Sequence, residues 1–158
     1  MTDTDKDVIS VLNELIEYSK DGEKGFKTSA EDVKNPELKT YFLQRAGECA
    51  SAASELQHQV RALGGDPETS TSVSGDLHRT WVNIKSALTG KDEEAVLNEV
   101  ERGEDHALKA YKDALEKLGK LHMVPGNEVY AIVERQYHGV QRNHDQVKAL
   151  RDRARAQS

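Results

Sequence analysis

The sequence predicts an all-α protein, with four long amphipathic helices in two antiparallel hairpins and one shorter helix between the hairpins. Apolar residues recur every three or four positions over long stretches, which is typical of the buried face of a helix. Charged residues make up 32% of the chain and aromatic residues 5%, a mixture that suits aliphatic seams beneath wide polar faces. The 158 residues match one domain, expected to span 1–158.

The first two long helices are expected at about residues 5–34 and 36–63. Thr4 or Asp5 can cap the first helix at its start. The residue before a proline disfavours the helical region, whereas proline itself suits a first helical position, so Pro36 begins the second helix. The tight turn between the two helices makes them antiparallel neighbours.

The second pair of long helices is expected at about 92–118 and 127–155, with Asp92 as a cap and Gly119 as a stop. Between the pairs, a loop rich in Pro, Ser and Thr over 66–74 leads into a shorter helix at about 75–89. This connection is long enough to climb the whole bundle. One long crossover between two helical hairpins is the ferritin-like arrangement. The alternative is a plain up-down bundle with a surface hairpin.

Composition excludes several classes of function. The net charge is −6 and no extended basic face is visible, which argues against nucleic-acid binding. The acidic N-terminus does not resemble a signal peptide, and no apolar run reaches the roughly 20 residues of a membrane helix, so we expect a cytoplasmic protein without membrane contact. The single cysteine, Cys49, has core spacing and excludes an intrachain disulfide. Without a nucleophile elbow, phosphate loop or dinucleotide motif, we predict no catalytic residue and no organic cofactor, and favour a non-enzyme.

Glycines inside the predicted helices draw attention to three glutamates. Each such glycine costs about 0.5–1 kcal/mol relative to alanine. The five positions are Gly22, Gly25, Gly47, Gly103 and Gly139. Three of them are followed directly by a glutamate: Gly22 by Glu23, Gly47 by Glu48 and Gly103 by Glu104.

These three glutamates and His144 all lie 11 or 12 residues from the same end of the bundle, roughly 16–18 Å deep. Glu101 lies one turn from Glu104. Buried carboxylates are costly unless they are paired or bind metal, and carboxylates with an imidazole suit iron or manganese, with zinc as a further option. We therefore hypothesise a metal site formed by Glu23, Glu48, Glu101, Glu104 and His144, with Asp145 or Gln141 orienting the imidazole.

The pattern departs from that of di-iron bundles, in which two helices each carry Glu-x-x-His. Ser51 stands where a histidine would follow Glu48, and Gln141 replaces the glutamate before His144. The one literal motif, Glu55 with His58, lies about ten ångströms deeper and forms a weaker second candidate set. The competing interpretation has no metal: lysines and arginines such as Arg45 neutralise the glutamates, and the glycines allow close helix packing.

The sequence also resembles a bacterial four-helix-bundle family of the ferritin-like superfamily, which is catalogued as a domain of unknown function. The segments that carry this resemblance are Tyr18–Phe26, Leu63–Pro67, His78-Arg79-x-Trp81, Glu101–Asp105, His144-Asp145 and Leu150–Asp152. The resemblance implies the ferritin-like bundle and a bacterial, cytoplasmic setting. It implies no established activity and no agreed metal ligands.

Two hypotheses about function follow. The first is a carboxylate metal site with iron oxidation or peroxide handling as its chemistry. The second is a non-enzymatic, stress-associated helical protein that associates with itself, for example as a homodimer, or with another protein, through an apolar strip around Trp81 or the crossover helix.

Overall fold

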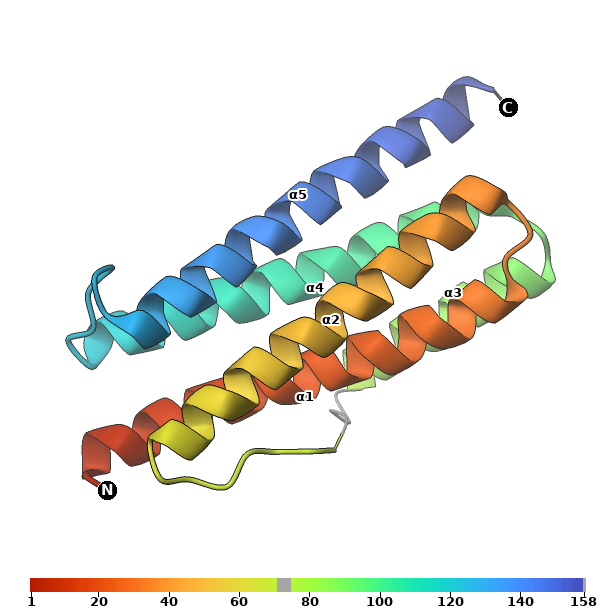
Figure 1. Cartoon of the computed structure of the whole chain (residues 1–158). Coiled ribbons are helices and arrows are strands. Elements are labelled where there is room, and N and C mark those ends of the chain that lie inside the picture. The colour runs from red at the N-terminus through yellow and green to blue at the C-terminus, as the bar shows by residue number, and fades with distance from the viewer. Residues whose placement is uncertain (71–74, 158) are drawn as a thin grey trace.

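Five helices and no strand make up the described parts of the chain, residues 1–70 and 75–157 of a computed structural model (Figure 1). The helices are α1 (Asp3–Asp32), α2 (Pro36–Ala62), α3 (Gly75–Thr89), α4 (Glu93–Lys120) and α5 (Glu128–Ala156). The all-α prediction is confirmed, and each predicted boundary lies within two residues of the observed one. Positions 71–74 of the predicted loop lie outside the described residues. None of the described helices is long and apolar enough to cross a membrane.

The helices form two hairpins joined by a crossover, as the sequence predicts. α1 packs along α2, and α4 packs along α5, while α3 lies against α4 and α1 (Figure 1). In the described parts of the chain, α2 and α5 are not among the pairs that pack closely through their backbones. Side chains join these two helices instead: Arg135 pairs with Glu55, and Arg153 pairs with Glu37 at 2.8 Å.

Most of the helix ends follow the expected capping chemistry. The Asn35 side chain accepts hydrogen bonds from the backbone N–H groups of Glu37 and Leu38, at 2.9 and 3.2 Å. Asp92 accepts one from Ala95 at 3.1 Å. The first four backbone N–H groups of a helix have no partner within the helix. The side chains bond two of these groups at the start of α2 and one at the start of α4, which stabilises both helices.

Two predicted ends differ from the structure. Thr2, not Thr4 or Asp5, caps α1, because Thr2 and Asp5 bond each other's backbone N–H reciprocally and so form a capping box. α4 continues through Gly119 to Lys120, and His122 takes the left-handed conformation with φ +67°. The backbone bond from Met123 N to the Leu118 carbonyl, 3.1 Å long, closes the end there.

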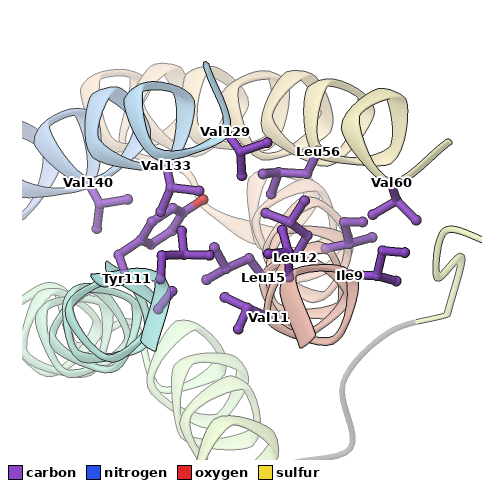
Figure 2. Packing of buried hydrophobic residues seen from close by; sticks show 14 residues of the cluster. Ile9, Val11, Leu12, Leu15, Leu56, Val60, Tyr111, Val129, Val133 and Val140 are labelled. Carbon is purple, nitrogen blue, oxygen red and sulfur yellow. The ribbon is translucent and has the colours of Figure 1, made fainter. Parts of the chain in front are cut away.

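Two apolar clusters fill the bundle at different heights. In the first, Leu12 and Leu15 of α1 meet Leu56, Tyr111 and Val133 of the other three long helices (Figure 2). The second cluster gathers around a different set of buried side chains, which includes Phe26, Phe42, Ile84, Val100 and Val147. The clusters leave a polar belt between them, at residues 17–25 of α1, 50–55 of α2, 101–110 of α4 and 141–146 of α5.

The crossover helix α3 docks through Trp81 onto a glycine of α1. A Cβ atom at Gly25 would lie 2.2 Å from the Trp81 ring, so only glycine fits beneath the indole. The indole N–H donates to Asp21 at 3.1 Å, and the Trp81 and Phe26 rings meet edge-on with centroids 5.1 Å apart. Close approach of the indole therefore explains this mid-helix glycine.

Candidate functional site

A buried ion pair links Glu104 of the polar belt to Arg45 of α2, which lies outside the belt. Glu104 of α4 is 2% exposed and Arg45 of α2 is 5% exposed. Arg45 donates from Nη2 to Oε1 at 2.9 Å and from Nε to Oε2 at 3.1 Å, so both carboxylate oxygens are engaged. The Tyr41 hydroxyl donates to Oε2 at 3.4 Å. Glu104 therefore has a guanidinium as its counterion.

The pKa values of this group follow from burial and from the pair itself. Burial lowers the pKa of Arg45, but the charge of Glu104, its hydrogen bond and smaller contributions from other neighbours together hold that pKa above its ordinary value. Burial, followed by the charge of Glu104, raises the pKa of Tyr41 well above its ordinary value. Arg45 therefore stays charged, with a neutral phenol beside it.

Three of the predicted acids lie near enough to the buried thiol of Cys49 to act on it electrostatically. Burial, with smaller contributions from the carboxylates of Glu104, Glu48 and Glu23, raises the pKa of Cys49 to about 11 against the opposing charge of Arg45. Cys49 is buried and free, as its core spacing predicts. A Cβ at Gly22 would lie 2.8 Å from its sulfur, so this glycine also permits close helix packing.

Two of these acids are only half-buried. The Glu23 side chain is 34% exposed, and its Oε1 lies 3.9 Å from Lys20 Nζ. The Glu48 side chain is 40% exposed, and its Oε1 lies 3.8 Å from Arg45 Nη1. The structure therefore places Glu23, Glu48 and Glu104 near one level, but with a lysine or an arginine beside each carboxylate.

A second group of ligating side chains lies between α4 and α5. His144 Nε2 is 2.7 Å from Asp105 Oδ1 and 3.8 Å from Glu101 Oε1. One ligand atom from each of these three residues lies within 4.8 Å of the other two. Glu101 and His144 are two of the five predicted ligands. The third member, Asp105, was not predicted, although its i,i+4 spacing from Glu101 places both on one helical face.

Neighbouring charges hold this group in position. Arg151 bonds Oε2 of Glu101, which leaves Oε1 on the side of the imidazole. Asp145 Oδ1 lies 3.6 Å from His144 Nδ1, on the other edge of the ring. Asp105 Oδ1, 2.7 Å from Nε2, lies where it would accept a proton on that nitrogen. A metal on Nε2 would leave the proton on Nδ1, on the side of Asp145.

The weaker predicted set does not come together. Glu55 faces α5, where its Oε1 accepts a hydrogen bond from Gln136 at 2.8 Å. Gln136 in turn accepts one from the Tyr111 hydroxyl at 2.8 Å. His58 is exposed, and no metal-ligand group that includes Glu55 and His58 forms among the described residues.

A cavity of about 740 Å³ spans the polar belt and reaches side chains of both apolar clusters, and all five helices contribute to its wall. The Arg45–Glu104 pair and Cys49 line it, as do Tyr111 and Gln136. Neither Glu101, Asp105 nor His144 does, so the α4–α5 group and the cavity are separate places in the fold.

The overall arrangement matches a known class of protein. A crystal structure described as "ferritin like, diiron-carboxylate proteins from Bacillus anthracis str. Ames" aligns with a TM-score of 0.75 over 96% of this chain and 99% of that chain, at 20% identity. The fold is therefore that of a ferritin-like helical bundle. Residues 7–117 match the sequence model of the domain of unknown function DUF2383, and the chain belongs to this family. No curated protein matches the sequence.

The donor set at the centre of the bundle does not fit a dinuclear iron site. Such a site takes a glutamate from each of two helices and Glu-x-x-His from each of two others. Here both oxygens of the one fully buried glutamate, Glu104, bond to Arg45. No histidine of the described residues lines the cavity, and His144 is directed to Glu101 and Asp105 instead.

Proposed function

We propose that this protein is a non-enzymatic, ferritin-like metal-binding protein, with one divalent transition-metal ion held by Glu101, Asp105 and His144. The proposal is supported by one observation above all: two carboxylate oxygens and an imidazole nitrogen, from two helices, converge within 4.8 Å. Imidazole with carboxylates suits Fe(II), Mn(II) and Zn(II).

The surroundings of the group favour a site that is open and of modest affinity. The Asp105 side chain is 60% exposed, so solvent can complete the coordination of an ion. Arg151 orients Glu101 but also adds a positive charge nearby, which opposes a cation. Because His144 must be neutral to bind, acid should release the metal.

Calorimetric titration with Zn(II), Mn(II) and anaerobic Fe(II) tests the proposal. We expect one ion per chain. At a free metal concentration of 100 times Kd the native state gains about 2.7 kcal/mol, which raises Tm by about 5–11 °C for a chain of this size. His144→Ala and Asp105→Asn should abolish both effects. His138→Ala, which removes an exposed histidine of the same helix, is the matched control and should change neither.

Other results would contradict the proposal in distinct ways. Two ions per chain, or loss of binding in a folded Glu23→Gln or Glu48→Gln variant, would support the wider ligand set predicted from the sequence. Repeated turnover of Fe(II) with oxygen would support the iron-oxidase alternative. Unchanged binding in His144→Ala would exclude the α4–α5 group.

Self-association stays a prediction with less support. Trp81 is half-buried and bonds to Asp21, and it does not form an open apolar strip. The exposed large apolar side chains of the described residues lie on separate segments: Met1, Leu43, Val82 and Val124. Sedimentation equilibrium would measure the oligomeric state.

A further inference from the structure

The cavity at the bundle centre has the dimensions of a ligand site. Well-packed interiors hold few voids larger than a water molecule, whereas small-molecule sites measure about 300–1,000 Å³. At about 740 Å³, this cavity has the volume of a small-molecule site. Its wall is largely apolar and includes Phe26, Ile84, Val100 and Val140.

The mouth of the cavity lies between α2 and α5. Every exposed residue in its wall belongs to one of these two helices: Gln44, Gly47, Ser51, Arg135 and Arg142. The backbones of α2 and α5 are also not closely packed in the described chain.

Glycines on both walls of this mouth leave two positions without a side chain. A Cβ added at Gly47 would meet nothing within 4 Å, so the space above it is open. On the facing helix, a Cβ at Gly139 would meet only the tip of Arg142, at 3.7 Å. The α2–α5 seam is therefore open at these two positions, whereas Arg135 and Gln136 bond to Glu55 across it further along.

Two polar side chains of the wall can bond to a ligand. Asn143 is 5% exposed and lines the cavity, and its amide can both donate and accept a hydrogen bond. Glu48 Oε1 is buried and accepts no hydrogen bond from the described residues. A buried polar group without a partner costs about 1–3 kcal/mol, so a molecule that supplied one would be bound more tightly.

We propose that this cavity binds an uncharged, mainly aliphatic molecule whose head group both donates and accepts a hydrogen bond, such as an alcohol or a primary amide. The apolar wall takes the aliphatic body, and Asn143 or Glu48 pairs with the head. Apart from the exposed Arg142, the charged groups of the wall already lie in ion pairs: Arg45 with Glu104 and, at 3.8 Å, with Glu48, and Arg135 with Glu55. A charged head group would therefore lose its hydration without gaining an unpaired counterion in the interior.

Calorimetry and thermal melts with 1-octanol as the probe test this proposal on the whole chain. We expect one molecule per chain. Octanoate and octylamine, its charged analogues, should bind at least tenfold more weakly. The isomer 1-methoxyheptane, which accepts but cannot donate, should bind about three- to tenfold more weakly, the usual effect of one hydrogen bond.

Matched variants locate the site. Gly47→Leu places a side chain over the mouth and should weaken 1-octanol binding at least tenfold. Gly119→Leu makes the same change on α4, outside the cavity wall, where a Cβ also meets nothing within 4 Å, and should leave binding unchanged. In Asn143→Leu, the preference for 1-octanol over 1-methoxyheptane should fall toward one.

Failure of the proposal is distinct from failure of the metal site, because the two share no residue. Absence of 1-octanol binding, or equal losses in Gly47→Leu and Gly119→Leu, would overturn the cavity assignment. Tighter binding of octanoate or octylamine than of 1-octanol would overturn the assignment of an uncharged ligand.

Discussion

The Arg45–Glu104 pair gives the most direct test of how the polar belt is stabilised. Glu104→Gln keeps the shape of the side chain but removes its charge, which leaves a guanidinium that is 5% exposed with only the more distant Glu48 carboxylate, 3.8 Å from Nη1, as an anion. Breaking a buried ion pair from one side costs about 3–5 kcal/mol, because the remaining charge stays desolvated. Since glutamine can still accept one hydrogen bond from Arg45, we expect the lower end, about 3 kcal/mol.

Urea denaturation followed by circular dichroism measures this loss. With an m-value of about 1–3 kcal/mol/M, the midpoint should fall by about 1–3 M without a change in slope. Glu99→Gln is the matched control, because its partner Arg102 is 60% exposed and the pair contributes below about 1 kcal/mol. In the double variant Arg45→Met/Glu104→Leu both charges are absent, and stability should return to within about 1 kcal/mol of wild type. A stability loss below about 1 kcal/mol in Glu104→Gln would refute the reasoning. So would a double variant whose stability loss equals the sum of the losses in Arg45→Met and Glu104→Leu, each measured alone.

Three further predictions concern stability. Gly47→Ala should stabilise the chain by about 0.5–1 kcal/mol, because the added Cβ would meet nothing within 4 Å. Gly22→Ala should destabilise the chain by about 1–3 kcal/mol, because the added Cβ would lie 2.8 Å from the Cys49 sulfur. Thermal melts of both variants check this. The Cys49 pKa rises from 9.0 to about 11, so the unfolded thiol ionises first and stability should fall between pH 9 and 11, by about 2.7 kcal/mol for two units. Below pH 9 the thiol is protonated in both states and contributes nothing, and urea titrations of wild type and Cys49→Ala should diverge only above that pH. Asn35→Ala removes the cap of α2 and should cost about 1 kcal/mol in the same urea assay.

The fold could be predicted from the sequence because each element carries local signals that agree with one another. Pro36 after Asn35 both ends one helix and begins the next, and the observed cap is on Asn35. Gly64 directly follows the C-cap of α2 and takes the left-handed conformation that glycine commonly adopts there, with φ +86°. The end of α4 could not be placed in this way, because there a histidine, His122, adopts that conformation and gives no glycine signal.

The candidate site was predictable only in part, because a residue count fixes the height of a side chain but not its partner. Glu104 does lie inside at the predicted level, yet the charge that satisfies it comes from Arg45 on another helix. Glu101 and His144 do meet, but on the α4–α5 side, with Asp105 rather than with the central acids. Which way each carboxylate turns depends on the rotation of four helices about their axes, and one helical residue changes that direction by about 100°.

Trp81 is the only tryptophan in the chain, and it lies where the crossover joins the two hairpins. Its binding surface comes from α1, while the helix that carries it also packs on α4. That surface is complete only after elements distant in sequence have assembled. Indole fluorescence consequently reports this late assembly step, whereas far-ultraviolet dichroism reports helix formation in every segment. A refolding experiment that records both signals would separate the time at which the helices form from the time at which the hairpins unite.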